Sequence, residues 1–246
     1  MNDNWIPEDS PLEAAIVYDS LYSYANLLIK YGANINDTDV FYGTVLHEVI
    51  RGKGSEMYRN TYSENSDTNK FRVNQNRAME KVLWLIKNGA DINAKNSFGN
   101  PPLYDAITFR YDKIAEVLID KGSDINTAGK DGKTLLHHAE SPSLLKKLIK
   151  KGADVNARGE DGLTPLHMAA FSNNFEKAKI LIENNANVNI KDYDSHLSPL
   201  GWLIVDSFDP DMAKLLISHG AEIPQDLVKQ YGLTDLFEKI NKELRR

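Results

Sequence analysis

The sequence predicts an all-α protein, a solenoid of about six helix-turn-helix repeats with short hairpin turns and a helical C-terminal cap. Two recurring phrases predict it. The first resembles Gly-Ala-Asp-Val-Asn and begins at residues 32, 89, 122, 152, 185 and 220. The second resembles "LTPLHMAA", which starts at residue 163, and follows most copies of the first. Since the copies recur at about 33 residues with one insertion, we expect one supersecondary unit stacked repeatedly.

These phrases and their period resemble those of ankyrin-repeat proteins. The resemblance runs from about residue 5 to the C-terminus and is most complete over 159–191. It implies an ankyrin-repeat solenoid that forms a single domain over residues 1–246. We expect repeats at 5–38, 39–95 (with an inserted loop at 51–77), 96–128, 129–158, 159–191 and 192–223, and a cap at 224–246.

The fifth repeat contains the signals that position its helices. Thr164 can cap the first helix of the pair, and Pro165 suits the first turn, where no N–H is needed. Apolar residues in "EKAKILIE" (176–183) lie largely on one face of a second helix, which should pack back on the first. Asn185 replaces the Gly of other copies and should take the left-handed position after this helix.

Other repeats vary the same plan. The fourth loses three residues, which predicts a short first helix and a second helix capped by Ser141. In the sixth, Asp209 caps the second helix. Residues 224–246 predict two helical segments that cover the last repeat, and at the other end we expect Trp5 and Ile6 to fold over the first repeat.

Composition narrows the function. The chain has 246 residues, 41% of them hydrophobic, a formal net charge of −6 and no cysteine. A negative chain lacks the field that drives non-specific nucleic-acid binding, so we expect no nucleic-acid partner. No secretory signal and no apolar run of about 18 residues is evident, so we expect a cytoplasmic protein without membrane contact.

Three histidines, His47, His137 and His167, occupy the same position in their repeats, three residues after the helix-capping position. The resemblance implies that this histidine is a hydrogen-bonding strut between neighbouring repeats, so we assign it no catalytic or metal-binding role. Acidic residues such as Asp91, Asp124 and Asp154 also recur at one position, which favours a role in turns. We expect no enzyme, no metal and no cofactor.

Large aromatic residues interrupt the repeat pattern. The resemblance implies that turn tips and the exposed side of each first helix line a concave surface that binds partners. Aromatics exposed there are good interface anchors, although each could instead pack between repeats. The predicted partner-binding residues are Trp5, Phe41, Tyr42, Phe98, Phe109, Tyr111, Phe171 and Tyr193.

The insertion at 51–77 is the second candidate surface. It carries six basic and three acidic residues with aromatic residues between them. Long loops are usually functional or disordered, so the alternative is a tolerated excursion without a partner. The predicted binding residues of the loop are Tyr58, Arg59, Tyr62, Phe71 and Arg72.

These observations predict a non-enzymatic module that binds another protein through its concave face and is a monomer when free. One alternative is a cognate inhibitor or immunity protein, whose acidity would suit a basic toxin or an enzyme. A further alternative is an adaptor with two binding faces. Fold alone cannot choose between them, because function lies in sites placed on folds.

Overall fold

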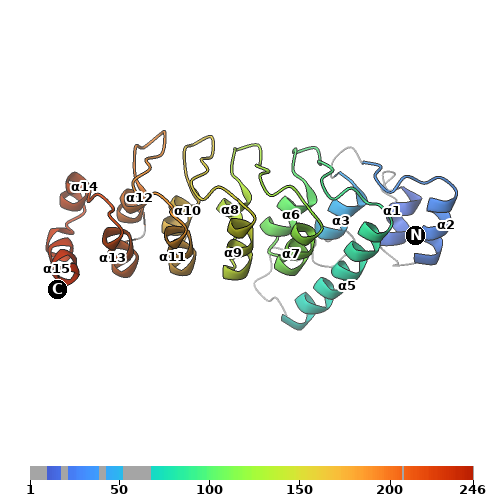
Figure 1. The fold of residues 1–246 in the computed structure, drawn as a ribbon, viewed down its shortest axis with the longest axis horizontal. Helices are drawn as coiled ribbons and strands as arrows, with labels where there is room; N and C mark the ends of the chain where they lie inside the picture. The colour runs from blue at the N-terminus through green and yellow to red at the C-terminus, as the bar shows by residue number, and fades with distance from the viewer. Residues whose placement is uncertain (1–9, 18–21, 39–42, 52–67, 207, 246) are drawn as a thin grey trace, which may run out of the picture. The chain divides into compact units, whose positions relative to one another are not determined.

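The computed structural model describes residues 10–17, 22–38, 43–51, 68–206 and 208–245, with no side chains described for 68–75. Within these ranges the chain forms fourteen α-helices and no β-strand (Figure 1), which confirms the predicted all-α class. No helix in the described part is both long and apolar enough to cross a membrane. The helices fall into two compact units, Met1–Thr127 and Ala128–Arg246. The single-domain organisation stays a prediction.

Unit 1 is a set of stacked helix pairs. In chain order its helices are α1 (Pro11–Val17), α2 (Tyr22–Lys30), α3 (Val45–Arg51), α5 (Thr68–Lys87), α6 (Pro102–Thr108) and α7 (Asp112–Asp120). The pairs are α1 with α2, α3 with α5, and α6 with α7, and the first helices stack in the order α1, α3, α6.

Unit 2 repeats this plan and ends in two further helices. Its helices are α8 (Leu135–His138), α9 (Pro142–Lys150), α10 (Pro165–Phe171), α11 (Phe175–Glu183), α12 (Pro199–Val205), α13 (Pro210–Ser218), α14 (Gln225–Gln230) and α15 (Thr234–Leu244). Figure 1 shows α8, α10 and α12 in the row beside the hairpin turns, and α9, α11 and α13 in the other row. The final pair packs on α12 and α13.

The predicted helix caps of unit 2 are confirmed. The Thr164 hydroxyl accepts a hydrogen bond from the His167 N–H (3.4 Å). Ser141 accepts one from Leu144 (3.3 Å), and the Asp209 carboxylate accepts one from Met212 (2.8 Å). Each side chain satisfies an N–H that has no partner within the first turn of its helix, so short polar residues mark where these helices begin.

The turns contain a second recurring device. Carboxylates of Asp91, Asp124 and Asp154 each accept the N–H two residues further on, at 2.8 to 2.9 Å, which confirms their role in turns. Asn185 has φ +69, which confirms its left-handed conformation at the end of α11. In four copies the Asn that ends the phrase links neighbouring repeats; Asn156, for example, accepts from the N–H of Asn187 (2.7 Å).

The predicted loop at 51–77 overlaps a helix at its C-terminal end. Residues 68–77 belong to α5, which is 20 residues long, whereas α7 in the next pair has nine. The expectation of a loop over all of 51–77 is therefore wrong. The reason is composition, because Thr68–Lys87 contains no Gly or Pro and several strong helix formers, so nothing stops the second helix from extending.

The short first helix predicted for the fourth repeat is confirmed, since α8 has four residues where α10 has seven. Lys177 of α11 fills the space beside it. Its side chain is fully buried and its Nζ donates to the carbonyl O of His137, near the end of α8, at 2.8 Å. The apolar core continues from α10 to α15, where Leu181, Leu200 and Leu216 are fully buried.

Candidate binding surface

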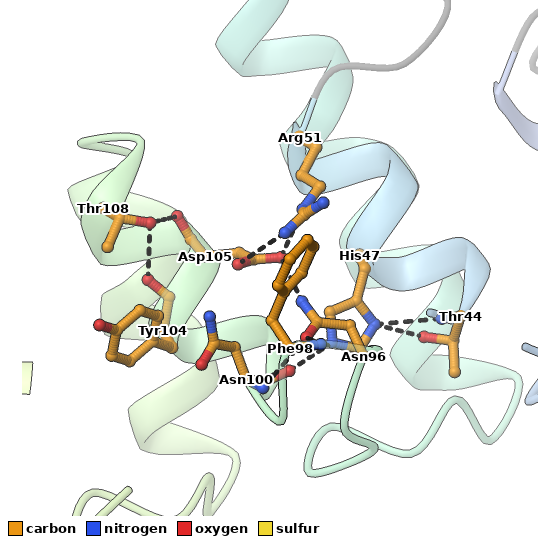
Figure 2. A network of polar contacts seen from close by, with 9 residues as sticks. All are labelled: Thr44, His47, Arg51, Asn96, Phe98, Asn100, Tyr104, Asp105 and Thr108. Carbon is orange, nitrogen blue, oxygen red and sulfur yellow. Dashed lines mark hydrogen bonds and ion pairs between the residues drawn. The ribbon is translucent and has the colours of Figure 1, made fainter. Parts of the chain in front are cut away.

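The strut histidine of unit 1 joins two neighbouring repeats (Figure 2). The N–H of Thr44 donates to Nδ1 of His47 (3.2 Å), so Nε2 carries the ring proton. Nε2 then donates to the carbonyl O of Asn100 in the next repeat (3.1 Å). The ring is buried, and both of its nitrogens are occupied by the backbone.

Unit 2 has two copies of this strut. His137 accepts from the N–H of Thr134 (3.0 Å) and donates to the carbonyl O of Leu163 (3.0 Å). His167 accepts from Thr164 (3.1 Å) and donates to Leu197 (3.1 Å). The structural role that the resemblance implied is therefore confirmed for all three histidines.

Burial keeps the rings of His137 and His167 neutral at physiological pH. It lowers the pKa of His137 to about 4, and it also lowers the pKa of His167. A ring that is neutral, buried and bonded at both nitrogens does not relay protons or ligate metal. Among the described residues, no group of three or more His, Asp or Glu side chains could hold a metal ion.

An ion pair supports an aromatic ring in unit 1 (Figure 2). Nε of Arg51, at the end of α3, lies 2.8 Å from Oδ2 of the buried Asp105 on α6. The Arg51 guanidinium also lies 5.7 Å from the centre of the Phe98 ring. The Phe98 N–H donates to Oδ1 of Asn96 (2.9 Å), so both the backbone and the ring of Phe98 are held in place.

Four of the predicted partner-binding aromatics are exposed. The exposed fraction is 48% for Phe98 and 44% for Phe109 in unit 1, and 47% for Phe171 and 54% for Tyr193 in unit 2. The alternative, that each of these rings is buried between repeats, does not hold for them. Whether they bind a partner stays a prediction.

Tyr111 does not belong to this set, because only 4% of it is exposed and the expectation of an accessible side chain is wrong. Arg110 adopts a left-handed conformation with φ +60, and the chain turns so that Tyr111 directly precedes α7 as its N-cap residue. The Tyr111 N–H then donates to the carbonyl O of Ala106 (2.8 Å). Burial also raises the pKa of the Tyr111 hydroxyl.

The other predicted residues are not placed. Trp5, Phe41, Tyr42, Tyr58, Arg59 and Tyr62 lie outside the described residues. Phe71 and Arg72 lie in the first turns of α5, where only the backbone is described. Their roles stay predictions.

The exposed rings of unit 2 are held by specific partners. Phe171 of α10 packs edge-to-face against Trp202 of α12, with ring centres 6.2 Å apart. The Trp202 indole N–H donates to Oδ2 of Asp192 (3.0 Å). On the turn, the Arg158 guanidinium lies 4.2 Å from the centre of the Tyr193 ring, a cation–π arrangement.

Asp192 organises the turn that carries Tyr193. Its carboxylate accepts the N–H groups of Asp194 (2.9 Å), Ser195 (2.6 Å) and Leu197 (2.9 Å). Burial alone would raise the pKa of Asp192, but these bonds and that from Trp202 lower it. Gly162 lies beneath the same turn, and a Cβ there would come 2.7 Å from the Tyr193 backbone nitrogen.

Sequence reasoning missed two features of this surface. Trp202 was not singled out, although it stands in the position after the strut site, where the other copies hold no Trp. The Asn side chains that link successive turns were also missed. Their signal was present in the recurrence of Asn at the end of the first phrase.

Comparison with known families gives a direct match. The family described as ankyrin repeats (3 copies) matches residues 71–158 and again residues 139–226. Together these ranges cover more than half of the chain.

Relatives are known from viruses, bacteria and animals. The chain is 29% identical over 132 residues to FPV219, an ankyrin repeat protein of fowlpox virus, which covers 48% of this chain and 28% of the viral protein. It is 30% identical over 112 residues to the phosphocholine transferase AnkX of Legionella pneumophila, covering 46% of this chain and 10% of AnkX. It is 28% identical over 230 residues to human ankyrin repeat and SOCS box protein 6, covering 86% of this chain and 43% of the human protein. The chain therefore spans less than half the length of each of these relatives.

Proposed function

Because the chain belongs to the ankyrin-repeat family, whose repeats are generally protein–protein interaction modules, we propose that it is a non-enzymatic module that captures a partner protein. The proposed surface, which we call the turn face, consists of the hairpin turns and the exposed side of the first helix in each pair. It corresponds to the surface that the sequence predicts to be concave.

The observation that carries this proposal is the set of four exposed aromatic rings, Phe98, Phe109, Phe171 and Tyr193. Large aromatic residues dominate the binding energy of protein interfaces. Three of these rings are already held by neighbours, namely Phe98 by Arg51, Phe171 by Trp202 and Tyr193 by Arg158. A surface that is ordered before binding loses less conformational entropy when the partner arrives.

A non-enzymatic role fits the chemistry of the buried polar groups. The histidines that most resemble catalytic residues hold neighbouring repeats together. The protein would then act by occupying its partner. We favour a cognate inhibitor, such as an immunity protein. A cytoplasmic location and a monomeric free state stay predictions.

The adaptor alternative has one observation in its favour. In unit 2 the second helices and the cap form a surface cavity of about 390 Å³, away from the turn face, lined by Phe175, Asp211, Lys214, Leu215, Ser218 and Leu244. A cavity of this size can accept an apolar side chain. An adaptor would use it for a second partner while the turn face holds the first.

Affinity capture from source cells tests the proposal. The wild-type chain is compared with a variant that carries Ser at Phe98, Phe109, Phe171 and Tyr193, and captured proteins are identified by mass spectrometry. A matched control places Ser at Leu83, Phe175 and Tyr231, which are similarly exposed but lie on second helices or the cap. Thermal melts establish that all three proteins fold.

We expect one stoichiometric partner to be captured by the wild type and the control and lost from the turn-face variant. The partner's own activity, measured with and without the chain, then separates an inhibitor from an adaptor. Equal capture by the wild type and the turn-face variant would refute the turn face as the binding surface. Loss from the control alone would favour the surface formed by the second helices.

A further inference from the structure

The first helices of unit 2 present an unusual combination of side chains. None of α8, α10 and α12, all fully described, contains a Lys or Arg. The position after the strut site holds His138, Met168 and Trp202 in these three successive helices, and each of these side chains is partly exposed. Phe171 lies beside Trp202. The floor of the turn face in unit 2 is therefore largely aromatic and apolar, and its helices contribute no Lys or Arg.

Carboxylates flank this floor. Asp206 follows α12 directly, and its N–H donates to the carbonyl O of Trp202 (3.0 Å), so the helical spacing places its exposed side chain on the Trp202 side. Glu140 follows α8 and accepts a hydrogen bond from Asn174 just beyond α10 (3.0 Å). His138 adds no positive charge at neutral pH, because burial lowers its pKa.

Two of the basic groups on the neighbouring turns, Lys133 and Arg158, are engaged locally. Nζ of Lys133 lies 3.3 Å from a carboxylate oxygen of Asp131 and 2.8 Å from one of Asp161. Arg158 donates to the carbonyl O of Lys191 (2.6 Å) and stacks on Tyr193. Lys130 and Lys191 are exposed on the turns, whereas α9, "PSLLKKLIK", shows the lysines that second helices carry. Among the paired helices of unit 2, lysine residues therefore lie in the second helices and not in the first.

From this division we propose that the Phe171–Trp202 pair binds an arginine side chain in a basic segment of the partner protein. The planar guanidinium would stack on an aromatic face, for which Trp is the best ring, and would pair with the carboxylate of Asp206. The carboxylates at this place would repel an acidic segment. An aliphatic segment would bury them without offering them a partner. This inference rests on the proposed function and specifies the partner chemistry at one part of the turn face.

The test uses random twelve-residue peptides displayed on phage and selected on the full-length chain. Enriched peptides are synthesised with arginine and with citrulline, which has a similar shape and no charge. Their dissociation constants are then measured by fluorescence anisotropy. Phe171→Ser and Asp206→Asn alter the proposed site, and Glu183→Gln, an exposed carboxylate on α11, is the matched control. Thermal melts check that each variant folds.

We expect enriched peptides to contain arginine and to bind at least tenfold more weakly when it is replaced by citrulline. Phe171→Ser should weaken binding by a similar factor, Asp206→Asn by threefold or more, and Glu183→Gln by less than twofold. Enriched peptides that lack arginine but depend on Phe171 would overturn this inference and leave the proposed function standing. Binding that ignores both site variants, or no enrichment at all, would overturn the inference and count against the turn face of unit 2.

Discussion

The strut histidines show how a single residue type can resemble catalytic machinery and serve the fold. Each ring accepts from one backbone N–H and donates to a carbonyl of the following repeat, so it stabilises the stack only in the neutral form. Recurrence of the histidine at one position favoured a structural role, and the resemblance to ankyrin-repeat proteins implied the strut. Burial supplies the physical reason, since it lowers the pKa values of His137 and His167.

This arrangement predicts a loss of stability in mild acid. The pKa of His137 is about 4 in the folded chain and near 6.5 when the chain is unfolded. The unfolded state therefore takes up its proton first as pH falls, and stability present above pH 6.5 is lost progressively down to pH 4. The difference amounts to about 3 kcal/mol. Carboxylates with lowered pKa values, such as Asp192, lose their stabilising contribution only at pH values below this window.

Chemical denaturation between pH 7.5 and 4 measures this effect. His137→Gln keeps a donor near the position of Nε2 but does not titrate, so its free energy of unfolding should vary less with pH. His219→Gln, at an exposed site, should behave as the wild type. A pH profile of His137→Gln as steep as that of the wild type would show that His137 is not the source of the pH-dependent loss of stability.

Exposure also separates two classes of apolar side chain. Leu181→Ala removes a fully buried side chain and should lower the free energy of unfolding by about 2 to 5 kcal/mol. Tyr193→Ser should cost about 1 kcal/mol or less, because the ring is exposed. Tyr111→Ala should resemble Leu181→Ala. Denaturation curves that rank Tyr111 with Tyr193 would contradict the buried placement of Tyr111.

At the scale of elements, helix boundaries that depend on local chemistry could be predicted. Thr164, Ser141 and Asp209 cap helices because short polar side chains accept the first N–H groups, and Asn185 tolerates the left-handed conformation. Two features, the start of α5 and the burial of Tyr111, could not be predicted from such local chemistry. The start of α5 lay within an insertion that has no counterpart in other repeats. The inward turn of Tyr111 depended on the conformation of Arg110.

Lysine in a core position illustrates coupling between elements. The third residue of the second helix is Ile114, Leu144 and Met212 in α7, α9 and α13, but Lys177 in α11. Lys81 of α5 behaves similarly, since its Nζ donates to the carbonyl O of Val17 at the end of α1 (2.6 Å). Both lysines bond the end of the preceding first helix. Lys177 does so where α8 is shortened to four residues.

Replacing this lysine should weaken the stack. Lys177→Met keeps most of the side-chain volume but leaves the buried carbonyl of His137 without this donor. We expect a loss of about 1 to 3 kcal/mol in the free energy of unfolding. Lys179→Met, at an exposed site on the same helix, should change it by less than about 0.5 kcal/mol. Equal stability of the wild type and Lys177→Met would show that the hydrogen bond contributes nothing.

At the scale of the whole molecule, the recurring phrases predicted the family and the fold class because each repeat solves the same packing problem. The binding surface was predicted only in part. Exposure of Phe98, Phe109, Phe171 and Tyr193 followed from repeat position, whereas Trp202 and its bond to Asp192 depend on contacts between successive repeats. The identity of a partner depends on side chains outside the repeat pattern, so the pattern cannot predict it.

The central claim is that the turn face binds the partner, and two neighbouring phenylalanines allow a direct test. Phe171 and Phe175 are 47% and 42% exposed, but Phe171 lies at the end of α10 and Phe175 begins α11. The measurement is the dissociation constant of the captured partner for the wild type, Phe171→Ser and Phe175→Ser. We predict that Phe171→Ser weakens binding at least tenfold and that Phe175→Ser leaves it unchanged. Weakening by Phe175→Ser alone would contradict the account and place the partner on the second helices.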